Sequence, residues 1–230
     1  MDPAAYDHWY RTPRGDWIGR RELALLLAAL QPRASESVLD VGCGSGYFTR
    51  ALARHTDGPV TGVDLDPAAI AYARQQAAQR ASYAIADACA LPFADASFDL
   101  AVSITALCFV ADEGAAVREL LRVARRRVAI GLLHQGSLLW RRKGRGGGSG
   151  AYRGARWHTR REARVLLDGL GARRVQLRTA IALDSASRCA RVLEALLPAR
   201  LPFGAFLLLS ADVDRVTPAA PAHAARTRAD

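Results

Sequence analysis

The chain has 230 residues, of which 50% are apolar, 23% charged and 7% aromatic. This length favours one large domain, and the apolar share excludes disorder along the whole chain. The densest apolar runs, Leu23–Leu30 and Leu201–Ala211, are too short for a transmembrane helix, which needs about 20 apolar residues. Because the first ten residues also lack the pattern of a secretory signal, we expect a cytoplasmic protein.

The positive charge is concentrated in the second half of the chain. Residues 1–135 carry 14 basic and 15 acidic residues (net −1), whereas residues 136–230 carry 18 and 7 (net +11). Segment 141–164 alone has nine basic residues against Glu162, a net charge of +8. This charge fits a nucleic acid, an acidic membrane surface or an anionic substrate. Compositional drift toward arginine on a solvated surface explains it as well.

The cysteines lie far apart, at positions 43, 89, 108 and 189. Zinc sites and disulfide frameworks commonly show closely spaced pairs, so we expect neither a metal site nor a disulfide network.

The first 32 residues, an aromatic segment followed by a predicted helix over Trp17–Leu30, form a cap ahead of a regular alternation. Strands are predicted over Ser37–Val41, Val60–Asp64, Ser82–Ala86, Phe98–Ser103 and Val128–Leu133. The helices between them are predicted over 47–54, 66–80 and 112–124, with Asp66 as an N-cap. Short apolar strands that alternate with helices predict a parallel sheet covered on both faces.

The regular alternation stops after Leu133. Lys143–Gly154, within a basic loop over 143–158, has six glycines in twelve residues, too many for a regular element. It is either a flexible linker or, as we favour, a mobile lid over a site. A helix over 159–170 with a Thr159/Glu162 capping box, a strand over 174–181, a helix over 185–197 and a strand over 204–213 are predicted next. Residues 214–230 are expected to form a loose tail.

A glycine-rich turn, VLDVGCGSG over 38–46, carries the first chemical signal. A strand leads into Gly42, Gly44 and Gly46 and then into a helix, and glycines there allow a tight turn and a close approach to a ligand. The GxGxG spacing differs from the GxGxxG of dinucleotide sites. No Lys-Ser/Thr follows, so the turn is not a triphosphate-binding loop.

Three aspartates, Asp40, Asp64 and Asp87, lie at the ends of successive strands. Asp64 is placed to accept two hydrogen bonds from a ribose diol, and Asp87 to accept one from an adenine amino group. Each one alone is equally well a helix cap or a solvated loop residue. Together they favour a ligand site, because ligands bind at this edge of such sheets.

Three segments, VLDVGCGSG, GVDLDP and DACALPFADASFDLAVS, resemble successive motifs of class I S-adenosylmethionine-dependent methyltransferases. The resemblance points to the type 11 group, related to the ubiquinone and menaquinone biosynthesis enzymes, and extends roughly from Tyr6 to Ala211. It implies one domain over 1–213 with a Rossmann-like, doubly wound α/β fold. The expected sheet has seven mostly parallel strands with helices on both faces, and the last strand, Gly204–Val213, is antiparallel.

The resemblance also implies the cofactor, S-adenosyl-L-methionine, which leaves as S-adenosyl-L-homocysteine, and the residues that bind it. Asp40 and the three glycines surround the methionine part, Asp64 binds the ribose, and Asp87 with Ala88 binds adenine. The predicted cofactor-binding set is Asp40, Gly42, Cys43, Gly44, Gly46, Asp64, Leu65, Asp87, Ala88 and Ser103.

The acceptor side is predicted from YDHWYRTPRG and GAYRGARWHT, which resemble the substrate wall in a smaller set of family members. The predicted substrate-binding residues are Tyr6, Trp9, Tyr10, Tyr152, Arg153, Arg156 and Trp157. Aromatic faces suit a sulfonium, although plain packing is the alternative. Methyl transfer needs no protein nucleophile. If the acceptor must lose a proton, His134, after the fifth strand, is the best-placed base, with a structural role as the alternative.

We therefore predict direct in-line methyl transfer to a small-molecule acceptor. One alternative is a methyltransferase of RNA or another nucleic acid that uses the basic second half. This alternative is disfavoured because no RNA-binding module is visible and because SITA, at 103–106, replaces the NPPY-like tetrapeptide of base amino-group methylation. A non-catalytic protein that binds S-adenosylmethionine is the other alternative.

Overall fold

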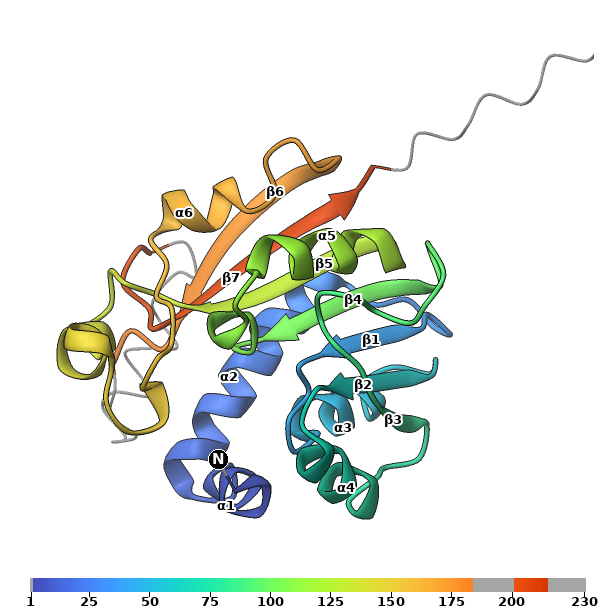
Figure 1. Ribbon diagram of the computed structural model, residues 1–230, viewed down its shortest axis with the longest axis horizontal. Helices are drawn as coiled ribbons and strands as arrows, with labels where there is room; N and C mark the ends of the chain where they lie inside the picture. The colour runs from blue at the N-terminus through green and yellow to red at the C-terminus, as the bar shows by residue number, and fades with distance from the viewer. Residues whose placement is uncertain (1, 184–200, 215–230) are drawn as a thin grey trace, which may run out of the picture.

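The computed structural model describes residues 2–183 and 201–214, which form a seven-stranded sheet in the order β3-β2-β1-β4-β5-β7-β6 (Figure 1). The strands are β1 (Val38–Val41), β2 (Val60–Asp64), β3 (Ala81–Ile85), β4 (Phe98–Ile104), β5 (Ala124–Leu133), β6 (Ala172–Ala180) and β7 (Phe206–Val213). β7 runs antiparallel to both of its neighbours, while the first five strands are parallel. The predicted mostly parallel sheet with an antiparallel last strand is confirmed.

The strand order reverses beside β1. The chain moves outward from β1 to β2 and β3 and then returns to place β4 on the other side of β1. In sheets of this kind the connections that follow the two central strands diverge, which leaves a crevice at their carboxyl ends. The topology therefore makes the turn after β1 the candidate position for a ligand.

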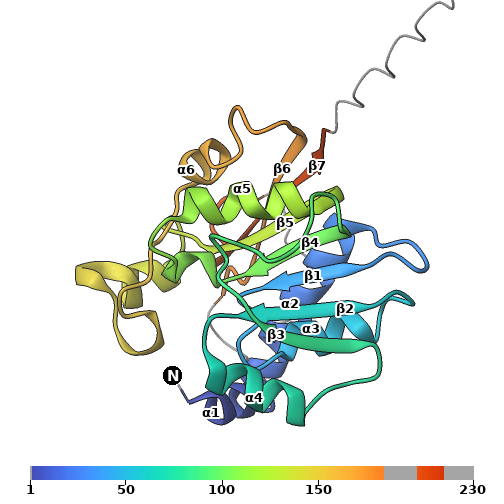
Figure 2. The same ribbon diagram turned by 45° about the vertical axis from the view of Figure 1, so that its right-hand side comes forward.

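Helices cover both faces of the sheet (Figures 1 and 2). One face carries α1 (Pro3–Trp9), α2 (Pro13–Leu30), α3 (Tyr47–Ala53) and α4 (Pro67–Gln75), and the other carries α5 (Glu113–Val123) and α6 (Arg160–Val165). The central strands are buried on both sides, as their continuous apolar sequences require.

The amino-terminal cap contains one helix that the sequence analysis did not predict. α1 is a separate helix, capped by Asp2, and α2 begins at Pro13 rather than Trp17. The Thr12 hydroxyl accepts a hydrogen bond from the Gly15 amide over 3.1 Å. A cap residue followed by proline is a helix-start signal, so the start of α2 at Pro13 could be predicted from the sequence.

Two helices end earlier than predicted. α4 stops at Gln75 rather than Arg80, and α6 stops at Val165 rather than Leu170. Arg80 has a φ of +70°, and Gly169 and Gly171 have φ of +73° and +69°, so the chain turns there to enter β3 and β6. The α6 capping box is confirmed, with the Glu162 amide 3.2 Å from the Thr159 hydroxyl.

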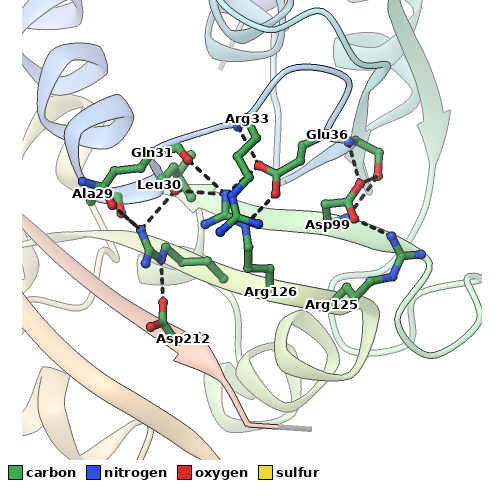
Figure 3. A network of polar contacts seen from close by, with 11 residues as sticks. Ala29, Leu30, Gln31, Arg33, Glu36, Asp99, Arg125, Arg126 and Asp212 are labelled. Carbon is green, nitrogen blue, oxygen red and sulfur yellow. Dashed lines mark hydrogen bonds and ion pairs between the residues drawn. The ribbon is translucent and has the colours of Figure 1, made fainter.

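β5 begins at Ala124, before the predicted start at Val128. Its first arginines donate hydrogen bonds to backbone carbonyls at the carboxyl end of α2, which holds this part of the chain in the strand (Figure 3). Arg126 donates to the Gln31 carbonyl over 3.1 Å and pairs with Glu36 at 2.6 Å. Arg127 donates to the Ala29 carbonyl over 2.8 Å. These cations satisfy the open carbonyls of a helix end. They lie at the amino edge of the sheet, away from the carboxyl ends of the parallel strands, so their role is structural.

The glycine-rich segment forms a series of short turns: a π-helical turn over Trp140–Gly144 and 3-10 turns over Arg145–Gly147 and Gly150–Tyr152. The predicted helix over 185–197, Cys189 and the tail beyond Asp214 lie outside the described residues. None of the helices in residues 2–183 and 201–214 is long and apolar enough to span a membrane.

Candidate functional site

The glycine-rich turn joins β1 to α3 at the carboxyl edge of the sheet. Gly42, Gly44 and Gly46 have φ of +74°, +53° and +78°, a region that side chains disfavour. A Cβ on Gly42 would lie 2.2 Å from the Cβ of Ala106, which follows β4, so only glycine fits there. A Cβ on Gly44 would meet nothing within 4 Å, so the turn faces open space. This is the geometry of a turn that holds a ligand against its backbone.

Asp64 fastens this turn to the end of β2. One carboxylate oxygen accepts the Gly44 amide over 2.8 Å, and the other accepts the Asp66 amide over 3.0 Å. The side chain is only half-buried, and it lies beside the open space in front of Gly44. A carboxylate held in this way is preorganised to receive further hydroxyl donors, such as those of a ribose.

Asp40 lies beneath the turn, in register with Gly62 of β2 and Val102 of β4. Its carboxyl group is 1% exposed and accepts a hydrogen bond from the Thr49 hydroxyl over 2.7 Å. Burial raises the pKa of Asp40 to about 7, the charge of Asp64 adds to the rise, and the Thr49 bond opposes it. A nearby cation would therefore convert a neutral acid into a carboxylate near neutral pH.

The remaining predicted cofactor residues line the same edge. Asp87 is exposed and accepts the Cys89 amide over 2.8 Å, which closes a local turn after β3. Leu65, after Asp64, is a large apolar side chain that exposes 65% of its surface. Burial raises the pKa of the Cys43 thiol, so that cysteine is not a reactive thiolate.

Ser103 lies inside β4, fully buried, and its hydroxyl has no hydrogen-bond partner among the described residues. The residue that follows the end of this strand, Thr105, has a φ of +55°. A left-handed threonine is strained, and such strain is concentrated at functional turns. Ala106, the next residue, packs directly on the glycine-rich turn, because a Cβ on Gly42 would lie 2.2 Å from its Cβ. The strained turn after β4 is thus in contact with the turn after β1.

The amino-terminal aromatic residues gather above the turn. Tyr10 stacks on Tyr47, the first residue of α3, with ring centroids 3.7 Å apart and an interplanar angle of 9°. The Tyr6 and Tyr10 hydroxyls are 3.2 Å apart, and Trp9 contacts the Tyr10 ring at its edge. Tyr10 is only 5% exposed, so its position agrees with the packing alternative, whereas Tyr6 and Trp9 are half-buried.

A second aromatic and basic group follows the glycine-rich segment. The Tyr152 and Trp157 rings are 5.5 Å apart and both are half-buried. Arg156 is bound through its amide to the Cys108 carbonyl and through its guanidinium to Glu113 at 3.1 Å. Arg153 is exposed. This loop therefore lies at the carboxyl edge, against the segment that follows β4.

His134 directly follows β5 and is 2% exposed. Its Nδ1 lies 2.9 Å from the Gly204 carbonyl, and its backbone forms a parallel bridge with His158. Burial lowers the pKa of His134, with the nearby Arg160 acting in the same direction. The imidazole is therefore neutral near pH 7, with Nδ1 as the donor and Nε2 as the proton acceptor.

Sequence reasoning missed the polar partners in this region. Thr49 binds Asp40, Tyr47 supports Tyr10, and Glu113 binds the Nε2 of the buried His158 at 2.9 Å. The position of Tyr47 right after Gly46 was a usable signal. The other pairs leave no local pattern. Within residues 2–183 and 201–214, no group of three or more histidine, cysteine, aspartate or glutamate residues is arranged to hold a metal ion.

Comparisons with known proteins agree with this geometry. Residues 39–130 match the family described as "Methyltransferase domain". A malonyl-[acyl-carrier protein] O-methyltransferase of Pseudescherichia vulneris is 45% identical over 124 residues, which cover 53% of this chain and 48% of that protein. The chain thus spans about half the length of this curated relative.

Solved structures share the fold over most of the chain. A possible histamine N-methyltransferase of Thermotoga maritima superposes with a TM-score of 0.70 at 22% identity, covering 91% of this chain and 95% of that one. The magnesium protoporphyrin IX methyltransferase of Synechocystis PCC 6803, with S-adenosylhomocysteine bound, has a TM-score of 0.58 at 18% identity and covers 84% and 81%. At these identities the likeness establishes the fold.

Proposed function

We propose that this chain, which belongs to the class I S-adenosylmethionine-dependent methyltransferases of type 11, methylates an oxygen atom of a small anionic acceptor. The observation that carries the proposal is the glycine-rich turn, held by Asp64 at the carboxyl edge of the sheet, with a basic aromatic loop at the same edge. The cofactor supplies a methyl group on a positively charged sulfur.

The chain itself has to bind the cofactor and orient the acceptor for in-line attack, because the sulfonium is already an activated donor. In the proposal Gly42, Gly44 and Gly46 hold the methionine part and Asp64 holds the ribose hydroxyls. Leu65 and Asp87 receive adenine, one through an apolar contact and the other through a hydrogen bond. All six positions adjoin the ends of β1, β2 and β3, so one extended ligand can reach them.

The acceptor class is inferred from the character of the same edge. Phe109, Leu138 and Phe203 expose 53%, 48% and 44% of their surfaces and follow β4, follow β5 and precede β7. Arg153 and Arg156 lie in the adjoining loop. Apolar side chains beside arginines suit an acceptor with an apolar body and an anionic group. The relative from Pseudescherichia vulneris is named for a malonyl group, which carries a carboxylate, and this supports the proposal.

His134 has a role only for some acceptors. A carboxylate is already deprotonated at neutral pH and needs no base, whereas a hydroxyl must lose its proton during transfer. We assign the acceptance of that proton to the Nε2 of His134. His134→Gln should lower kcat about 10²- to 10⁴-fold for a hydroxyl acceptor and leave kcat for a carboxylate acceptor within a few-fold. Equal losses for both would assign His134 a purely structural role.

The test is a turnover screen with S-adenosylmethionine and sets of carboxylic acids, phenols and amines, with the methylated atom located by mass spectrometry and NMR. We expect product from oxygen acids and a KM that rises in Arg153→Gln. Methylation of amines alone would refute the choice of oxygen. Cofactor binding without turnover of any acceptor would favour the non-catalytic alternative.

The basic segment 141–164 keeps nucleic acid as the second candidate. Binding to several phosphates releases counterions, so RNA affinity would fall by orders of magnitude over a few-fold rise in salt. A small acid held by one or two arginines gives a much shallower slope. Filter binding to mixed RNA at two salt concentrations separates these cases. Submicromolar, steeply salt-dependent binding that competes with turnover would refute the small-molecule proposal. The cytoplasmic location stays a prediction.

A further inference from the structure

A buried carboxylate in α1 lies at the centre of contacts that join three helices. Asp7 is 3% exposed, although it belongs to a short helix near the start of the chain. It forms an ion pair with Arg50 of α3, accepts a hydrogen bond from the Tyr72 hydroxyl of α4 over 3.3 Å, and pairs with the exposed Arg11 at 3.1 Å. Both views of the fold place α1 against α4 (Figures 1 and 2).

Arg50 extends this cluster to the glycine-rich turn. It is 8% exposed, and while one terminal nitrogen pairs with Asp7, the other donates to the Ser45 carbonyl over 2.7 Å. Ser45 lies between Gly44 and Gly46, the two left-handed glycines that shape the turn. The guanidinium therefore connects a helix outside the sheet to the backbone that faces the cofactor. A planar fork with fixed donors suits such a double contact.

The turn needs an external hold of this kind. Its glycines have no side chains to pack, and glycine is the residue with the most conformational freedom to lose on ordering. Beside the Val63 carbonyl of β2, which accepts the Gly42 and Cys43 amides over 2.8 and 2.9 Å, two side chains from other elements restrict it: Asp64 holds the Gly44 amide and Arg50 holds the Ser45 carbonyl. The first comes from β2 within the sheet. The second depends on Arg50, whose buried charge is compensated by Asp7 of α1.

We propose that Asp7 and Arg50 form a positioning pair through which helix α1 sets the shape of the cofactor-binding turn, so that docking of α1 and cofactor binding strengthen each other. The stack of Tyr10 on Tyr47 ties the end of α1 to the start of α3 and works in the same direction. Neither Asp7 nor Arg50 needs to touch the cofactor. Coupling of this kind is reciprocal by thermodynamic necessity, which makes it measurable from both ends.

The affinity end is measured by calorimetry with S-adenosylhomocysteine on the full chain. Asp7→Asn keeps the size of the side chain and removes the charge that compensates Arg50. Arg50→Lys keeps the charge, but its single ammonium lacks the fork that reaches both partners. Each variant should weaken binding about tenfold or more, as expected for loss of a charge-assisted hydrogen bond. The double variant should be little worse than either single variant, because both interrupt one connection.

The α1 end is measured by hydrogen exchange in the unmodified protein. Saturating S-adenosylhomocysteine should slow amide exchange in residues 3–10, and Asp7→Asn should remove most of this protection. This arm needs no variant for its first result, so a negative outcome counts against the proposal even if a substitution prevents folding. Exchange in residues 3–10 that is equal with and without S-adenosylhomocysteine would overturn the proposal.

The matched control is Asp57→Asn. It removes the contact of Asp57 with Arg80, at 3.5 Å, in which the Asp57 side chain is 71% exposed, and should leave both measurements unchanged. A merely structural role predicts a different pattern. In that case Asp7→Asn speeds exchange in α1 while the affinity for S-adenosylhomocysteine stays within twofold of the unmodified protein. That result would also overturn the proposal, and it would leave the proposed acceptor chemistry untouched.

Discussion

Asp64→Ala is the substitution that tests the cofactor site most directly. In the folded protein the carboxylate already accepts the Gly44 amide at 2.8 Å and the Asp66 amide at 3.0 Å. Its removal therefore takes away both a proposed ribose acceptor and one of the two side-chain contacts that hold the turn. Because Asp64 is half-buried, its charge is only partly screened by water.

The magnitude follows from the contacts. A hydrogen bond to a charged group contributes about 1.5–3 kcal/mol, and each 1.4 kcal/mol is a factor of ten in affinity. Loss of one ribose bond alone should weaken S-adenosylhomocysteine binding about 10- to 150-fold. Asp64→Asn should fall between Ala and the unmodified protein, because the amide keeps one acceptor oxygen but sets its NH₂ group against a backbone N–H.

Isothermal titration with S-adenosylhomocysteine measures the effect, and Asp66→Ala is the matched control. Asp66 caps α4 by accepting the Ala68 amide over 2.9 Å, so its loss should cost about 1 kcal/mol of unfolding free energy but change affinity less than threefold. If Asp64→Ala also binds within threefold of the unmodified protein, the ribose assignment is wrong.

Three further predictions concern the turn, its buried acid and the loop. Gly42→Ala should lower the free energy of unfolding of the ligand-free protein by about 2–4 kcal/mol in urea denaturation, because its Cβ would lie 2.2 Å from Ala106 at a φ of +74°. Gly44→Ala, with nothing within 4 Å, should cost only about 1 kcal/mol, and equal losses would contradict this packing argument. Asp40, with a pKa raised by burial to about 7, should release a proton when the cationic cofactor binds, so affinity should rise with pH up to about 7 and then level. Since its folded pKa exceeds the unfolded value of about 3.9, its contribution to stability is full below about pH 4 and is lost as the pH rises to about 7. Calorimetry in two buffers of different ionisation enthalpy detects the proton, and Asp40→Asn should abolish its release; affinity that is independent of pH between about 5.5 and 8 would count against it. Residues 143–154 should exchange amide hydrogens more slowly only when cofactor and acceptor are both present, whereas equal protection with and without ligands would identify a linker or an already rigid segment.

The sequence by itself determined the parts of the molecule that depend on local chain chemistry. The glycine-rich turn could be predicted because a tight turn with left-handed residues permits little besides glycine, as at Gly42, Gly44 and Gly46. The parallel strands before and after this turn could be predicted because burial on both faces requires continuous apolar runs. The position of Asp64 could be predicted because a residue at the end of a parallel strand lies at the carboxyl edge of the sheet, where ligands bind.

Local patterns misled where a polar sequence has a partner far along the chain. The first residues of β5 look like a charged loop, yet they form a strand because Arg126 reaches the end of α2 and Arg127 reaches Asp212, 85 residues away. In the same way, the ends of α4 and α6 were predicted too late. Helix propensity continues beyond the point where the chain must turn into the next strand.

Only the tertiary structure decided which polar groups meet inside the protein. Asp7 and Arg50 are 43 residues apart and His158 and Glu113 are 45 apart, and neither pair belongs to one periodic element. A buried charge is stable only when its partner is brought into contact, and that contact depends on how separate helices pack. The glycine-rich turn is therefore predictable from the sequence, but the contacts that hold its conformation form only when α1, α3 and the sheet pack together.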